Sequence, residues 1–290
     1  MSRASLAWLV VLFVGCSSPG GTLGTDDGGG GPGLPGADGS AAKDGAVQQP
    51  GTDASSGDDA QAPQGLSTLG SLVVLGDSMS DGGGQPPFYY NLLRADLDKL
   101  YGTVQYANAA QSGSQTGALA GQIDGLPKSL KGPVAVCITS GGNDMKAALP
   151  LVFTGTDAAV RAQMGTNIAT ALSKLLASGR FGASVDVHVF EANIYDASDG
   201  KGDFGSHNCA FGKGVPTTPT DAFFKSWNGE IATQVSAKSQ VVNDIHAHFV
   251  GHGYSGSPSW YWTDCTHPNA LGHDQLRRRF YTLISGKLLP

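Results

Sequence analysis

The sequence predicts an α/β domain in which helices cover both faces of a parallel β-sheet. Three observations lead to this fold class. Short apolar runs alternate with amphipathic segments, the runs are rich in β-branched residues, and they lack the polar alternation of a half-exposed strand. A strand that is apolar on both sides must be covered on both sides, which is the usual setting of parallel strands.

The elements follow one another in a regular order. Residues 71–75 form the first predicted strand, because this apolar run is too short for a helix. Residues 88–101 predict a helix with its leucines on one side. By the same patterns we expect strands at 103–108, 133–139 and 184–191, helices at 156–178 and 268–288, and a mainly helical segment at 221–249.

The first 67 residues differ in character from this domain. Residues 1–16 hold one cation, Arg3, and an apolar run that is typical of a secretory signal and too short to span a bilayer. Residues 17–67 are rich in Gly, Pro, Asp and Ser without aromatic residues, which is typical of a disordered linker. The linker carries a net charge of −6, equal to that of the whole chain, so the acidity says little about substrate. Residues 68–290 suit one compact domain.

The signal segment ends in Val14-Gly15-Cys16-Ser17-Ser18, which resembles the lipobox of bacterial lipoproteins. The resemblance implies lipidation of Cys16 after cleavage, and hence export and anchoring of the domain to the cell envelope. Ser17 stands where lipoproteins of the inner membrane commonly have aspartate, which favours the outer membrane or the cell surface. The alternatives are a secreted soluble protein or a signal anchor.

Three further cysteines lie in the predicted domain. Cys137 falls in an apolar strand and is expected to be a buried free thiol. Cys209 and Cys265 lie in loop-like sequence, and an oxidising compartment permits a disulfide between them. Their spacing alone does not establish the required geometry, so the pairing stays open.

Four polar clusters lie far apart in the chain. They are Gly76-Asp77-Ser78, Ser112-Gly113, Gly141-Gly142-Asn143-Asp144 and Asp264-Cys265-Thr266-His267. The first three follow predicted strands, and ligands collect at the carboxyl ends of parallel strands. Ester hydrolysis through a serine needs a nucleophile, a base, an acid that orients the base, and donors for the oxyanion. The clusters contain a candidate for each role.

Together with Asn193-Ile194-Tyr195-Asp196, these clusters resemble the sequence blocks of the SGNH (GDSL-type) hydrolase family. The resemblance covers essentially the whole domain and implies a three-layer α/β/α flavodoxin-like fold. It implies that Ser78 is the nucleophile, His267 the base and Asp264 its orienting acid. It also implies that the amides of Ser78 and Gly113 and the side chain of Asn143 bind the oxyanion, without metal or cofactor.

The sequence therefore predicts an exported serine esterase or lipase that forms an acyl-enzyme from a lipid, a small ester or an acetylated sugar. An acyltransferase or a polysaccharide O-deacetylase would use the same site. A non-catalytic ligand-binding surface lipoprotein is the alternative from another class. The sequence contains no basic stripe that would indicate a nucleic-acid partner. The sequence does not fix acyl length or oligomeric state.

Other side chains compete for functional roles. His246, His248 and His252 have spacing that suits a metal, but the end of a long amphipathic helix accounts for them and we predict no metal site. His207 has no acid at short range in the sequence. The aromatic residues 260–262, directly before Asp264, either line a substrate pocket or pack in the core.

Overall fold

The computed structural model describes residues 65–207, 209 and 216–289. The predictions for the signal segment, for Cys16 and for most of the linker lie outside the described residues. Packing begins before the predicted boundary at residue 68. Leu66 N–H donates to Ile284 O (2.8 Å), and Leu66 O accepts from the Tyr101 hydroxyl (2.7 Å). Leu66, at the end of the predicted linker, thus forms hydrogen bonds with two helices of the domain.

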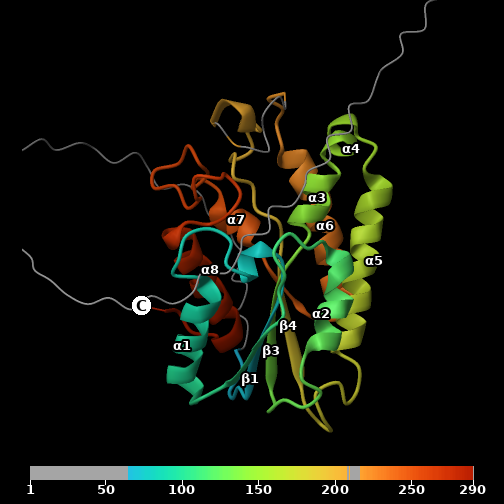
Figure 1. The fold of residues 1–290 in the computed structure, drawn as a ribbon, viewed down its shortest axis with the longest axis vertical. Helices are drawn as coiled ribbons and strands as arrows, with labels where there is room; N and C mark the ends of the chain where they lie inside the picture. The colour runs from blue at the N-terminus through green and yellow to red at the C-terminus, as the bar shows by residue number, and fades with distance from the viewer. Residues whose placement is uncertain (1–64, 208, 210–215, 290) are drawn as a thin grey trace, which may run out of the picture. The chain divides into compact units, whose positions relative to one another are not determined.

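A five-stranded parallel sheet, in the order β2-β1-β3-β4-β5, forms the middle layer (Figure 1). Its strands are β1 (Ser71–Gly76), β2 (Gln105–Asn108), β3 (Val134–Thr139), β4 (Val187–Ala192) and β5 (Val241–Asn243). Every residue of β1 and β3 is buried, because helices cover both faces. The predicted α/β fold with a parallel sheet is confirmed.

The helices enclose two hydrophobic cores, one on each face of the sheet. Alternate β1 residues divide between them: Val73 and Leu75 lie in one core, Leu72 and Val74 in the other. The first core contains residues of α2 (Leu119–Gly125), α3 (Gly142–Ala147), α4 (Leu149–Thr154), α5 (Ala158–Leu175) and α6 (Asp221–Ser236), and the second contains residues of α1 (Tyr89–Tyr101), α7 (Ile245–Phe249) and α8 (Ala270–Ser285). No helix in the described ranges has the length and apolar character to cross a membrane.

The mainly helical segment predicted at 221–249 is divided by a strand. After α6, Ser239 adopts φ 53°, and the Gln240 side chain then accepts from Val189 N–H (2.7 Å) and brings β5 alongside β4. Three residues are too few for a recognisable strand pattern. The short helices α2, α3 and α4 were also not predicted, since each has only six or seven residues.

The carboxyl ends of the strands are level with one another. Gly76 pairs with Thr139, Thr139 with Ala192, and Ala192 with Asn243. The loops after these strands therefore leave the sheet at one edge. Each loop after β1, β3 and β4 contributes residues to the site described next.

Candidate active site

Ser78 lies in a one-turn 3₁₀ helix, η1 (Ser78–Ser80), directly after β1. Asp77 caps this turn, because its carboxylate accepts from Met79 N–H (3.1 Å) and from the Thr139 hydroxyl (3.2 Å). Burial raises the pKa of Asp77 to about 6, although these hydrogen bonds act in the opposite direction. Asp77 thus fixes the backbone that presents Ser78.

Ser78, His267 and Asp264 form one hydrogen-bonded line. His267 Nε2 lies 2.7 Å from Ser78 Oγ, and His267 Nδ1 lies 2.6 Å from Asp264 Oδ2. A carboxylate only accepts, so Nδ1 carries the ring proton and Nε2 can accept from the serine hydroxyl. The structure brings together the three residues that the sequence predicted for the catalytic roles.

Asp264 is held in its ionised form. Partial burial alone would raise the pKa of Asp264, but hydrogen bonds from the His267 ring and from the backbone N–H groups of His267 and Thr266 lower it to about 2. Both backbone bonds measure 2.9 Å and end on Oδ1, which leaves Oδ2 for the imidazole. One tight turn therefore organises the acid and the base.

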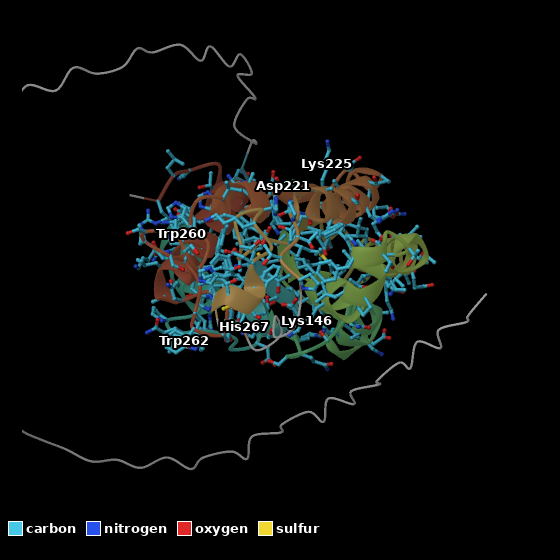
Figure 2. The ribbon with its side chains drawn as sticks, turned by 90° about the horizontal axis from the view of Figure 1, so that it is seen from above. Lys146, Asp221, Lys225, Trp260, Trp262 and His267 are labelled. Atoms are coloured by element: carbon cyan, nitrogen blue, oxygen red, sulfur yellow. A yellow bond between two sulfur atoms is a disulfide. The ribbon has the colours of Figure 1, made fainter. Side chains whose placement is uncertain are left out.

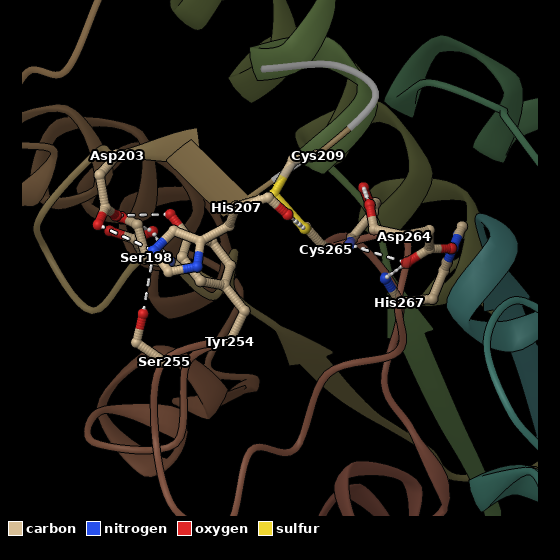
Figure 3. Close-up of a disulfide and its surroundings, with 11 residues drawn as sticks. Ser198, Asp203, His207, Cys209, Tyr254, Ser255, Asp264, Cys265 and His267 are labelled. Atoms are coloured by element: carbon tan, nitrogen blue, oxygen red, sulfur yellow. Dashed lines mark hydrogen bonds and ion pairs between the residues drawn. A yellow bond between two sulfur atoms is a disulfide. The ribbon is translucent and has the colours of Figure 1, made fainter. Parts of the chain in front are cut away.

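Distant segments hold this turn in place. The Tyr195 hydroxyl, from the loop after β4, donates to Thr266 O. Cys265 forms a disulfide with Cys209, with a Cα–Cα distance of 5.5 Å (Figure 3). Cys265 itself has φ 58°, in the left-handed region. The turn is therefore tied to two loops that precede it by more than fifty residues.

The candidate oxyanion donors differ in how the structure supports them. Asn143 lines the same pocket as Ser78, and its Nδ2 donates one hydrogen bond, to Ser114 O (2.9 Å). Gly113 adopts φ 77°, and it is not among the residues that line the pocket. Within the described residues, the backbone N–H groups of Ser78 and Gly113 donate no hydrogen bond.

An apolar pocket of about 140 Å³ opens beside Ser78. Its walls come from η1, α3 and α4, from the loop after β4, from Phe204, from the start of α6 and from the turn at 265–267. The apolar side chains in these walls are Met79, Met145, Leu149, Phe153, Ile194, Tyr195, Ala197, Phe204, Phe223 and Phe224. Lys146 and His267, both labelled in Figure 2, line the same pocket. No sequence pattern predicts this pocket, because its lining residues come from separate segments with no shared motif.

The aromatic residues before Asp264 lie elsewhere. Trp260 and Tyr261 are buried in the second hydrophobic core with Phe249. Trp262 is 37% exposed, and none of the three lines the pocket. Core packing, rather than a substrate wall, accounts for the two buried rings.

The three histidines of the predicted metal-like spacing, at 246, 248 and 252, have other partners. His246 Nδ1 contacts Ile194 O (3.1 Å), His248 Nε2 contacts Gln275 Oε1 (3.0 Å), and His252 stacks on Trp260. Among the described residues, no group of three or more His, Cys, Asp and Glu side chains is arranged to hold a metal ion.

His207 does have a nearby acid, contrary to the expectation from sequence. Its Nε2 lies 3.2 Å from Asp203 Oδ2 and 3.1 Å from Ser255 Oγ (Figure 3). One nitrogen cannot donate to a carboxylate and accept a serine proton at once. This second Ser, His and Asp group therefore lacks the relay geometry of the first.

Comparison with known proteins identifies related folds. A model of the GDSL-like Lipase/Acylhydrolase family matches residues 74–275. The lipase Lip_vut3 from a goat rumen metagenome is 20% identical, with a TM-score of 0.54 over 77% of this chain and 100% of that chain. An extracellular lipase from Streptomyces rimosus is 20% identical (TM-score 0.51; 74% and 98% covered), and the acetylxylan esterase Axe2 from Geobacillus stearothermophilus is 17% identical (TM-score 0.52; 75% and 96% covered). A comparison with curated proteins finds no match.

Proposed function

The chain belongs to the GDSL-like lipase/acylhydrolase family, and from this premise we propose that it hydrolyses carboxylic esters through an acyl-enzyme on Ser78. One observation carries the proposal: the line from Ser78 Oγ through the His267 ring to the Asp264 carboxylate, with contacts of 2.7 and 2.6 Å. In such a line the imidazole takes the hydroxyl proton while the carboxylate stabilises the charge that develops on the ring.

The reaction proceeds in two halves. Ser78 Oγ bonds to the ester carbonyl carbon as its proton passes to His267 Nε2. The bond from that carbon to the alcohol oxygen then breaks, and the alcohol leaves with the proton from Nε2. A water molecule attacks the acyl-enzyme, gives a proton to Nε2, and the acid leaves as Ser78 regains its hydrogen.

Three donors are proposed for the negative charge on the carbonyl oxygen. The Ser78 and Gly113 N–H groups make no other hydrogen bond within the described ranges, which leaves them available. The Asn143 amide has two hydrogens, and its contact with Ser114 O uses one of them. Removing one such donor typically lowers kcat by about 10²- to 10³-fold.

We assign the apolar pocket to the acyl chain of the ester. The acyl group stays bonded to Ser78 while the alcohol must leave and water must enter, so an apolar wall suits the group that remains. A cavity of about 150 Å³ accepts a benzene molecule. The pocket of about 140 Å³ therefore suits an acyl chain of roughly six carbons. An acetyl group would fill little of it, so the pocket supports a fatty-acyl ester over an acetylated polysaccharide.

Replacement of the nucleophile tests the enzyme hypothesis. Ser78→Ala should abolish turnover of a chromogenic hexanoate ester while the far-UV circular dichroism stays unchanged. A fluorophosphonate probe should label the wild-type protein and not the variant. A ligand-binding lipoprotein without catalysis would neither turn over the ester nor react with the probe. Retained activity in Ser78→Ala would refute the assignment.

Acyl transfer requires a separate measurement. The acyl-enzyme reacts with water in a hydrolase and with an alcohol or a sugar in a transferase, so the products distinguish the two. Adding alcohol and sugar acceptors and separating the products should give free acid as the main product. A dominant new ester would identify an acyltransferase.

We also propose export and lipid anchoring through Cys16, on the strength of the lipobox resemblance. The bond between Cys209 and Cys265 supports this, because disulfides persist in oxidising compartments. Expression in a bacterial host with radiolabelled palmitate should label the wild-type chain and not Cys16→Ser. Fractionation should place the labelled protein in the outer membrane. Equal labelling of both chains would contradict lipidation at Cys16.

A further inference from the structure

Gly83 and Gly84 form a short backbone segment, the strap, that lies against His267 of the proposed triad. Gly83 N–H donates to Ser78 O (2.6 Å), and Gln85 N–H donates to Pro268 O (3.1 Å). A Cβ atom added at Gly83 would lie 2.5 Å from His267 Cδ2 and 2.8 Å from His267 Nε2. The backbone at Gly83 therefore lies directly against the edge of the imidazole that faces Ser78.

His273 also contacts the strap. It lies in the first turns of α8, is fully buried, and its Nε2 lies 3.0 Å from Gly83 O. Its Nδ1 faces the Tyr89 N–H at 3.5 Å. Since a carbonyl only accepts and a backbone N–H only donates, the proton is on Nε2 and the ring is neutral.

The surroundings of His273 keep this ring neutral and oriented. Burial lowers the pKa of His273 to about 4; the contact with Gly83 O opposes this shift and the nearby His267 adds to it. Phe88 packs edge to face on the ring, and Tyr89 lies nearly parallel to it. A buried, aligned histidine with one donor and one acceptor is suited to holding a backbone carbonyl rather than to accepting a substrate proton.

We propose that His273 is a positioning residue: by donating to Gly83 O it holds the strap against His267 and so fixes the imidazole relative to Ser78. The inference rests on the proposed ester hydrolysis. It concerns the second half of the reaction most strongly. While Ser78 is acylated, its Oγ no longer donates to His267 Nε2, and the strap is then the contact that keeps this edge of the ring in place.

The test compares three variants on α8. His273→Leu removes the donor. His273→Gln keeps an N–H that can reach Gly83 O. Leu276→Ala, at another fully buried position of the same helix, is the matched control for lost packing. For each variant we would measure thermal unfolding, kcat, KM and the pre-steady-state burst of chromogenic alcohol.

Misplacement of a catalytic group by about 1 Å lowers rates by as much as 10²-fold, so His273→Leu should lose roughly 10- to 100-fold in kcat. KM should stay equal or fall, with a larger burst, because slowed deacylation accumulates the acyl-enzyme. His273→Gln should recover kcat to within a few-fold of wild type. Leu276→Ala should unfold at a lower temperature with kcat unchanged.

Other outcomes would overturn the inference. A folded His273→Leu protein with wild-type kcat would do so, as would a folded His273→Gln protein that loses as much kcat as the leucine variant. If His273→Leu does not fold, Gly83→Ala decides, since its Cβ would lie 2.5 Å from His267 Cδ2 and 2.6 Å from Ser78 O and must displace one of them. A folded Gly83→Ala protein with wild-type kcat would overturn the inference. Failure of the proposed function looks different: the wild-type protein would then neither turn over ester nor react with fluorophosphonate.

Discussion

Replacing Phe153 or Phe223 by alanine should shift the acyl preference to longer chains. The two rings, from α4 and α6, meet edge to face with centroids 5.9 Å apart, and both line the pocket that begins at Ser78. Helix α4 lies farther from the sheet than α3 (Figure 1). From this arrangement we expect the ring pair to close the end of the pocket that is distant from Ser78.

The size of the effect follows from the pocket. Each buried methylene contributes about 0.8 kcal/mol, which corresponds to about fourfold in kcat/KM. In a pocket of about 140 Å³, kcat/KM should rise by this factor per methylene until the chain reaches roughly six carbons. Longer chains then extend out of the pocket and gain no further burial, so kcat/KM should reach its maximum at this length. Removing a phenyl ring opens space for about two to four more methylenes, so the maximum should move to roughly eight to ten carbons.

The assay is a series of p-nitrophenyl esters from acetate to laurate, with kcat/KM measured for each. Phe153→Ala and Phe223→Ala should gain at least tenfold on decanoate while butyrate changes by less than threefold. Leu151→Ala is the matched control, because Leu151 lies on α4, is 40% exposed and does not line the pocket. A second series, with the alcohol lengthened at constant acyl group, should show no such maximum.

Two results would contradict this prediction. If the phenylalanine variants kept the wild-type maximum while folded, the ring pair would not limit the chain. If instead the alcohol series showed the maximum and the acyl series did not, the pocket would hold the leaving group, and the assignment of the two halves of the substrate would be reversed.

Three further predictions concern the triad loop and a buried carboxyl group. Asp264→Asn should lower kcat by about 10⁴-fold. Because the folded-state pKa of Asp264 is lowered to about 2, its carboxylate stabilises the wild-type protein above about pH 4. In urea titrations, the difference in free energy of unfolding between wild type and Asp264→Asn should therefore vanish as the pH falls towards 2. Cys209→Ser, which opens the bond to Cys265, should lower the free energy of unfolding by about 4 kcal/mol for a loop of this length and reduce kcat, whereas an unchanged urea midpoint would contradict the tether. Glu191 is fully buried and accepts from the Ser140 hydroxyl, and burial raises its pKa to about 7. Its ionisation therefore lowers the free energy of unfolding as the pH rises towards 7. Glu191→Gln should be more stable than wild type at pH 8 and not at pH 5, and an equal difference in free energy of unfolding at both pH values would count against this.

The sequence was sufficient for the fold wherever a residue pattern repeats within one element. The β1 run at 72–75 is apolar throughout because its alternate residues enter two different cores, and this pattern predicted a strand covered on both faces. The edge strand β5 has three residues and receives part of its alignment from the Gln240 side chain, so no local pattern marks it. Elements of this length depend on partners that the sequence does not reveal.

The site residues also differ in whether a local sequence pattern predicts them. Ser78, Asn143 and His267 lie in short motifs, and the level ends of β1 and β3 bring the first two motifs together. The pairing of Phe153 with Phe223 spans two helices with no motif in either. His273 contacts Gly83, 190 positions away in the chain. A histidine beside an aspartate in a helix gives no sign of which carbonyl it will meet.

The triad combines one local and one tertiary contact, and the two should fail separately. Asp264 and His267 are three residues apart, and the bonds to Asp264 Oδ1 arise within their own turn. The contact between His267 and Ser78 joins residues 189 positions apart. The Ser78 to His267 distance therefore depends on the ties from Tyr195, from Cys209 and from the Gly83 strap. Removing any of these ties should weaken catalysis while the contact between Asp264 and His267 stays formed. We therefore expect kcat to fall before the protein unfolds.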